Sequence, residues 1–356
     1  MAWRAPKCRQ AEADIIQPHS KQQRSADRLP VYIRGTGMYV PERVVENEYF
    51  VARLDTSDEW ITTRTGIRQR RWVADDECTS TMATRASAAA LKDAGLTIDD
   101  IDVIVCATAT GDCPFPATAC FVQAALGAGS RNIPALDVSA ACAGFVFGSI
   151  MAAGLIASRQ YDNALVIGAE TLSRYANPED RGTCILFGDA AGAAVWSRTR
   201  DPERGILYSE LGSDGTRAEH IWVPAGGSRL PTSHTTVAEH LQYLHMRGRE
   251  VYRFAVVKMQ ELIDRALDAT GVTADELKLL IPHQSNLRII ESVRQRLGLP
   301  REKVAVHIDR YGNTSAASIV MSLHEAKRDG TLHDGDVVLL VAIGAGLTWG
   351  VMVVRL

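Results

Sequence analysis

The segment AALKDAGLTIDDIDVIV (residues 89–105) returns 176 residues later as RALDATGVTADELKLLI (residues 265–281). Each copy has the pattern of a helix end, a glycine that stops the helix, a Thr-x-Asp-acidic turn and a buried strand. Similarity at a fixed offset indicates a duplicated unit. We therefore expect two equivalent halves that face each other about a pseudo-twofold axis.

Around each copy, apolar strands alternate with helical segments. In both halves the last helix opens in small residues, AACAGFVFGS (140–149) and GNTSAASIVMS (312–322). The βαβα order predicts an α/β fold with a mostly parallel sheet between helical layers. In the first half we expect strands at 31–39, 101–109, 133–139 and 163–170, and helices at 79–94 (stopped by Gly95), at 117–127 and from near Cys142 to about Arg159.

The length of 356 residues predicts more than one structural unit. We divide the chain into a polar, disordered tail (1–28), an N-terminal half (29–200) and a C-terminal half (201–356). The net charge is -3 and no long basic run occurs, which argues against nucleic acid as a partner. No apolar stretch is long enough to span a membrane as a helix.

Seven cysteines, an odd number without CxxC pairs, argue against a disulfide framework and a zinc site. Without a secretion signal, we expect the reducing cytoplasm. GAGLTWG (344–350) has the wrong spacing and lies before a strand, so a nicotinamide or flavin fingerprint is not met. We expect neither a metal nor a resident cofactor.

Three residues are candidates for catalysis. Cys142 opens an apolar helix, where the helix dipole lowers a thiol pKa and free amides can bind an oxyanion. Its small neighbours would leave room for a thioester. His283 ends a buried strand, and Asn313 lies where the matching helix starts. Each has a plain alternative, namely a buried packing thiol, a structural histidine and a helix cap. The repeat brings all three together, as thiolate acyl transfer requires.

The chain resembles the β-ketoacyl-acyl-carrier-protein synthase III family of thiolase-fold condensing enzymes over about residues 31–356. The motifs that carry the resemblance are TSDEWITTRTGIRQRR, FPATAC, AACAGF, DRGTCILFGDAAGAA, IPHQSNLRII, DRYGNTSAAS and GAGLTWG. The resemblance implies a thiolase-like α/β fold, internally duplicated, in an αβαβα sandwich. It also implies condensation of a short acyl-coenzyme A (acyl-CoA) with malonyl-acyl-carrier protein (malonyl-ACP), which initiates fatty acid synthesis.

By this resemblance, Cys142 takes the acyl group, and His283 and Asn313 stabilise the enolate formed on loss of carbon dioxide. The amides of Cys142 and Ala345 form the oxyanion hole, with Ala345 where many relatives have glycine. Phe115 reaches into the partner's acyl pocket, which implies a homodimer. The other roles are coenzyme A (CoA) binding, at Thr56, Trp60, Arg64, Arg181 and Asn286, and docking of ACP, at Arg288, Arg294 and Arg296.

Other functions stay open on the sequence alone. The same Cys-His-Asn set serves related acyltransferases and polyketide-starter enzymes, so it does not determine the acceptor. A papain-like hydrolase is disfavoured because no papain-type sequence surrounds Cys142, and a non-catalytic scaffold would not need all three polar residues. Plain surface roles remain for Trp60, Arg64, Arg294 and Arg296. Ser285 stands where many relatives have alanine, and the primer length is not determined.

Overall fold

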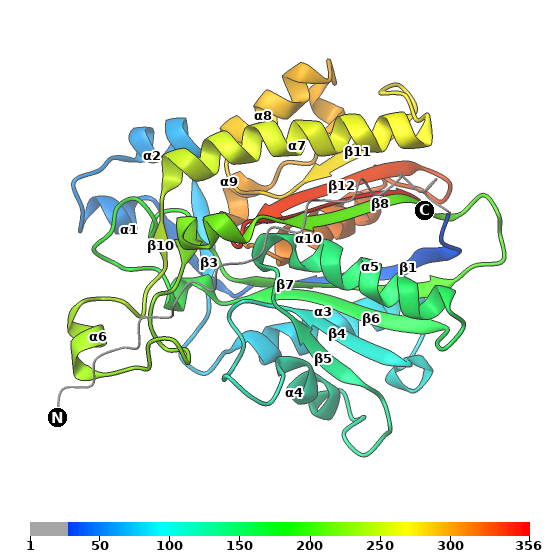
Figure 1. Cartoon of the computed structure of the whole chain (residues 1–356), viewed down its shortest axis with the longest axis horizontal. Helices are drawn as coiled ribbons and strands as arrows, with labels where there is room; N and C mark the ends of the chain where they lie inside the picture. Colours follow the sequence, from blue (N-terminus) through cyan, green and yellow to red (C-terminus); the bar gives the residue numbers. More distant parts are fainter. Residues whose placement is uncertain (1–27) are drawn as a thin grey trace, which may run out of the picture.

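Two mixed β-sheets form the centre of the computed structural model, which describes residues 28–356 (Figure 1). The prediction for the tail, residues 1–28, therefore lies outside the described residues except for Arg28. The first sheet has the strand order β1-β7-β6-β4-β5 and the second β11-β12-β13-β8. The bounds are β1 Val31–Tyr39, β4 Val103–Ala107, β5 Ala135–Val138, β6 Asn163–Glu170, β7 Ala190–Arg198, β8 Gly205–Ser213, β11 Leu277–Pro282, β12 Val337–Gly344 and β13 Thr348–Arg355.

The two sheets repeat one topology, which confirms the predicted duplication. Strands β1, β7, β6 and β4 of the first sheet correspond in order to β8, β13, β12 and β11 of the second. Where β5 pairs with β4 in the first sheet, a single parallel bridge joins Leu280 to Val304 in the second. The chain passes from one sheet to the other between Arg198 and Gly205. The boundaries predicted for the two halves stay predictions.

The expectation that the strands are mostly parallel is wrong. Among the strands of residues 28–356, parallel pairing joins β4 to β5, β4 to β6 and β11 to β12. Strands β7 and β13 pair antiparallel with both of their neighbours. The reason is connectivity, because β7 and β13 return directly beside β6 and β12 without the crossover helix that parallel pairing needs.

Helices cover both faces of each sheet (Figure 1). From one side of the molecule to the other, the layers are α3 with α4, the first sheet, α5 with α10, the second sheet, and α7 with α8. Helices α5 and α10 contact both sheets and form the shared middle layer. This is the predicted αβαβα sandwich. The bounds are α3 Thr79–Ala94, α4 Thr118–Ala125, α5 Gly144–Ala157, α7 Gly248–Thr270, α8 Leu287–Arg296 and α10 Ala317–Arg328.

The repeated segments adopt matching local structure. Gly95 and Gly271 end α3 and α7 with left-handed backbones, at φ 64° and 68°, as the glycine stops predicted. Before the two middle helices, Ala141 and Ser315 have φ 46° and 47°. A residue with a side chain rarely adopts this conformation, so its recurrence at matched places indicates a shared sharp turn.

The remaining elements cluster at one end of the sandwich, near the start of α7 (Figure 1). Strands β2 and β3 pair antiparallel, and β9 and β10 form a short ribbon. Among residues 28–356, no helix combines the length and the apolar character needed to cross a membrane. The bounds are β2 Arg43–Glu46, β3 Gln69–Trp72, β9 Ile221–Trp222, β10 His245–Met246, α1 Glu48–Val51, α2 Asp58–Thr65, α6 His234–Ala238 and α9 Ile308–Tyr311.

Candidate active site

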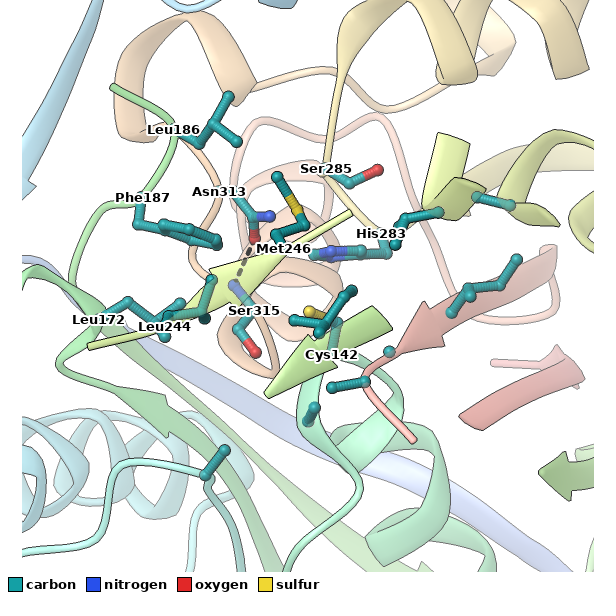
Figure 2. A pocket seen from close by; sticks show the side chains of 18 of the residues that line it. Cys142, Leu172, Leu186, Phe187, Leu244, Met246, His283, Ser285, Asn313 and Ser315 are labelled. Carbon is teal, nitrogen blue, oxygen red and sulfur yellow. Dashed lines mark hydrogen bonds between the residues drawn. The ribbon is translucent and has the colours of Figure 1, made fainter. Parts of the chain in front are cut away.

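A cavity of about 350 Å³ lies where the two halves meet, and it contains all three predicted catalytic residues. Cys142, His283 and Asn313 point toward one another within it (Figure 2). The rest of the lining is largely apolar, with Leu172, Leu186, Phe187, Leu244, Met246 and Met259 among its members. An apolar cavity with a few convergent polar groups suits a thioester with a hydrocarbon acyl chain.

Cys142 lies in a single 3-10 turn, Ala141–Ala143, that leads from β5 into α5. The thiol is partly exposed to the cavity. The small residues around it have a different purpose from the one predicted. Gly144 packs closely, since a methyl group there would lie 3.0 Å from the Ala107 Cβ of its own half and 3.5 Å from the Ala316 Cβ of the other half. Gly144 thus allows the two helix starts to pack together, and of the small residues around Cys142 only Ala141 lines the cavity.

The predicted lowering of the Cys142 pKa is not found. Burial raises the pKa of the thiol to about 12, and the opposing hydrogen bond with Ser315 is the smaller effect. The buried carboxyl of Glu170 acts in the same direction as burial. In an apolar site with few hydrogen-bond donors, the loss of hydration destabilises the thiolate more than the helix start stabilises it. At ordinary pH this raised pKa favours the thiol form of Cys142.

His283 follows directly after β11, as the sequence predicted for a strand-end loop. Its side chain is buried, and the Nδ1 atom lies 2.7 Å from the Ser318 hydroxyl of α10. Burial lowers the pKa of His283 to about 3, with a smaller contribution from His307. The imidazole is therefore neutral at ordinary pH. A neutral ring donates a hydrogen bond from one nitrogen only.

Asn313 is held by the first half of the chain. Its backbone N–H donates to the Leu186 carbonyl at 2.8 Å, and its backbone carbonyl accepts from the Gly188 N–H at 3.0 Å. Its side-chain oxygen accepts from the Ser315 amide at 2.9 Å (Figure 2), which leaves the side-chain NH₂ for the cavity. The alternative of a plain helix cap is wrong, because α10 begins only at Ala317.

Glu170 is a functional candidate that the sequence analysis missed. It is fully buried at the end of β6 and accepts hydrogen bonds from the hydroxyls of Thr110, at 2.5 Å, and Ser315, at 3.1 Å. Both hydroxyl residues line the cavity. Burial raises the pKa of Glu170 to about 7, against the lowering effect of these bonds. The signal in the sequence was a single acidic residue ending the apolar strand NALVIGAE.

The oxyanion-hole prediction involves two segments that do meet. Ala345 lines the cavity beside Cys142. Thr348 joins the two segments, because its hydroxyl lies 2.9 Å from the Ala140 carbonyl and 3.1 Å from the Ala345 carbonyl. Ser285 also lines the cavity. The role of the Cys142 and Ala345 amides stays a prediction.

The residues predicted to bind CoA lie together on and beside α2. The guanidinium groups of Arg64 and Arg181 lie 4.9 Å and 4.8 Å from the Trp60 ring centroid. The Asn286 side chain donates to the Arg64 carbonyl at 3.0 Å and also lines the cavity. Thr56 precedes α2, and its buried hydroxyl has no partner among the described residues. This Trp60 cluster of aromatic and cationic groups thus adjoins the cavity through Asn286.

The structure separates the remaining predicted residues from the cavity. Phe115 is 85% exposed and does not line the cavity of its own chain. Arg288 is exposed at the start of α8. The other two arginines of this helix are paired, Arg294 with Glu291 and Arg296 with Asp264, each at 2.8 Å. Their pairing reduces the free positive charge predicted for ACP docking.

Comparisons with known proteins agree with this geometry. A family model described as 3-oxoacyl-[acyl-carrier-protein (ACP)] synthase III matches residues 136–215, and its C-terminal model matches residues 267–356. Relatives named β-ketoacyl-[acyl-carrier-protein] synthase III are 53% identical in Symbiobacterium thermophilum and 49% in Caldanaerobacter subterraneus. Each alignment covers 92% of this chain and 98% of the relative.

Solved structures show the same fold. The 3-oxoacyl-[acyl-carrier-protein] synthase III of Aquifex aeolicus is 43% identical with a TM-score of 0.84, covering 92% of this chain and 100% of that one. The priming β-ketosynthase of the R1128 polyketide pathway is 34% identical with a TM-score of 0.85, covering 94% and 98%. The likeness thus spans nearly all of the described residues.

Proposed function

Because the chain belongs to the β-ketoacyl-acyl-carrier-protein synthase III family, a family of condensing acyltransferases, we propose that Cys142, His283 and Asn313 perform its chemistry. The substrates of this proposal are a short acyl-CoA primer and malonyl-ACP, and the product is 3-oxoacyl-ACP. The observation that carries the assignment is the convergence of one thiol and two hydrogen-bond donors in one apolar cavity.

In the first step, the sulfur of Cys142 attacks the carbonyl carbon of the acyl-CoA thioester. Amides of Cys142 and Ala345 donate to the developing oxyanion, which such preorganised donors stabilise strongly. The bond between the acyl carbon and the CoA sulfur then breaks. The thiol proton ends on that sulfur, so free CoA leaves and an acyl-cysteine remains.

In the second step, malonyl-ACP replaces CoA in the cavity. His283 and the Asn313 NH₂ donate to its thioester oxygen as carbon dioxide leaves, so that the electron pair is held as an enolate. The enolate carbon attacks the acyl group on Cys142, the carbon–sulfur bond breaks, and the thiolate takes up a proton from water. All groups in both steps come from the chain or its substrates, so we propose no resident cofactor.

The Trp60 cluster supports the choice of CoA as acyl donor. An indole ring can stack on adenine, and guanidinium groups bind phosphates in a fixed geometry. Arg288 is the candidate for contact with an acidic carrier protein, because it is exposed and, unlike Arg294 and Arg296, has no ion-pair partner among the described residues. The homodimer, suggested by the exposed Phe115, and the cytoplasmic location are further proposals.

A polyketide-priming role is the second candidate, since a priming β-ketosynthase shares 34% of the sequence and the fold. Both functions use the same acyl-cysteine and differ in the pathway that consumes the product. The higher identity to the fatty-acid enzymes, up to 53%, favours the first.

The proposed function is tested by mass spectrometry of the protein after incubation with acetyl-CoA. We expect one acetyl group on the Cys142 peptide, no adduct in Cys142→Ala, and an unchanged adduct in Cys113→Ala, whose thiol is exposed outside the cavity. Addition of malonyl-ACP should then release carbon dioxide and 3-oxobutanoyl-ACP. An adduct on another residue, or none, would overturn the proposal.

A further inference from the structure

The hydrogen bond between His283 and Ser318 joins two buried side chains behind the cavity. The His283 Nδ1 atom and the Ser318 Oγ atom are 2.7 Å apart, with residue exposures of 2% and 0%. The ring points from the end of β11 toward Asn313 and Cys142 (Figure 2). Its other nitrogen, Nε2, is therefore the one available to a substrate in the cavity.

The surroundings of Ser318 determine which partner donates. The Gln284 amide points at the same hydroxyl oxygen, at 3.5 Å, and an amide N–H can only donate. Among residues 28–356, the hydroxyl has no acceptor other than His283 Nδ1. A proton on Nδ1 would leave the buried Ser318 hydroxyl proton without a hydrogen-bond acceptor, which is unfavourable in a buried site. The Ser318 hydroxyl therefore donates to Nδ1.

The backbone around Ser318 is held in turn by His307 and Gln284. The His307 Nε2 atom lies 3.0 Å from the Ser318 carbonyl, and the Gln284 side-chain oxygen accepts from the His307 amide at 2.9 Å. These bonds hold the backbone that carries Ser318 in place. Burial also favours a proton on Nε2, because it keeps His283 neutral. A neutral ring whose Nδ1 accepts a hydrogen bond carries its one ring N–H proton on Nε2.

We propose that Ser318 is a positioning residue that holds His283 in the Nε2-protonated tautomer, so that His283 donates to the thioester oxygen of malonyl-ACP and does not accept the Cys142 proton. This inference rests on the proposed function of the site. It predicts that loss of the Ser318 hydroxyl weakens the second half-reaction and spares the first.

The test measures the rates of the two half-reactions separately in the Ser318→Ala variant. We expect the rate of malonyl-ACP decarboxylation to fall by about tenfold to a hundredfold, because an enolate donor becomes misdirected. The rate of Cys142 acylation by acetyl-CoA should stay within about threefold of wild type. Ser322→Ala is the matched control, since Ser322 is a buried serine one turn further along α10, bonded to the Ser318 carbonyl and not to His283. It should leave both rates near wild type.

Nitrogen-15 NMR of the His283 imidazole reports its tautomer directly. The tautomer would not change if Ser318 only stabilised the fold. In wild type, the His283 ring should show a protonated Nε2 and a bare Nδ1, with its signals identified by their loss in His283→Ala. In Ser318→Ala the two tautomers should mix. A wild-type proton on Nδ1, or an equal fall of both half-reactions in a folded Ser318→Ala, would overturn the inference. Absence of acylation and decarboxylation in wild type would instead overturn the proposed function.

Discussion

Gly168 of β6 and Gly344 of β12 each lie in close contact with the turn before the middle helix of the opposite half. A methyl group on Gly168 would lie 2.3 Å from the Ala316 carbonyl oxygen, and one on Gly344 would lie 2.7 Å from the Cys142 amide nitrogen. Because each glycine lacks a side chain, the turn before the middle helix of the opposite half can pack directly against its backbone. The active site depends on this exchange of contacts between halves.

Alanine at either glycine should destabilise the fold by about 1–3 kcal/mol, since backbone atoms cannot move aside cheaply. Denaturant unfolding measures this loss. Gly344→Ala should also slow acylation, because it displaces the Cys142 amide. Gly154→Ala is the control, since Gly154 lies within α5 with no atom within 4 Å of the added methyl, and there alanine should stabilise by about 0.5–1 kcal/mol. Equal effects at all three positions would contradict the close-contact argument.

Trp60→Ala should raise KM for acetyl-CoA by about tenfold or more, because base stacking on an aromatic ring contributes about 1–3 kcal/mol. Steady-state kinetics with acetyl-CoA and with acetyl-pantetheine, which lacks the nucleotide, check this expectation. The shorter thioester should be affected little. A similar rise in KM for both substrates would show that Trp60 does not contact the nucleotide.

Arg288→Glu should raise KM for malonyl-ACP about tenfold and leave KM for acetyl-CoA near wild type, because the reversed charge repels an acidic partner. The effect should weaken at high salt. Arg200→Glu makes the same charge change at the opposite end of the first sheet, after β7, and is the control. If both variants raise KM equally, the effect is one of net charge and not of docking.

Phe115 is too exposed, at 85%, to be stabilised by its own chain. In a homodimer we expect it to be covered and to limit the partner's acyl pocket. Sedimentation should give twice the chain mass of 38.7 kDa. Phe115→Ala should raise kcat/KM for longer primers relative to acetyl-CoA without lowering thermal stability of the monomer fold. A monomer with an unchanged primer profile would count against this role.

Glu170 should make the protein less stable as the pH rises from about 4.5 to 7. Its folded-state pKa of about 7 exceeds the ordinary value of 4.5, so the folded state holds a proton that the unfolded state has lost. The stability associated with this proton is complete below pH 4.5 and is lost above pH 7. The loss is on the order of 3 kcal/mol at most.

Glu170→Gln removes this ionisation. Its free energy of unfolding relative to wild type should therefore increase across the same pH range, as measured by urea unfolding at pH 5, 6 and 8. Glu59→Gln, at an exposed position of α2, provides the baseline. A wild-type minus Glu170→Gln difference that does not change with pH would mean that Glu170 stays ionised when folded.

Much of the local structure could be predicted from the sequence. The helix at Thr79–Ala94 with its Gly95 stop and the strand at Val31–Tyr39 have the predicted bounds, because turn chemistry and apolar periodicity are local properties. The repeat predicted two equivalent halves, and local motifs singled out Cys142, His283 and Asn313. All three line one cavity.

Only the tertiary structure determined what surrounds these residues. Ser315 bonds Glu170 across 145 positions of the chain, and Ser318 bonds His283 across 35, so neither pair has a local pattern. The Cys142 pKa also depends on desolvation by both halves, which outweighs the effect of the helix start visible in the sequence. Sequence thus determined which groups are present and which elements carry them. Long-range packing determined their protonation, their tautomers and their partners, because these depend on desolvation and on contacts between distant segments.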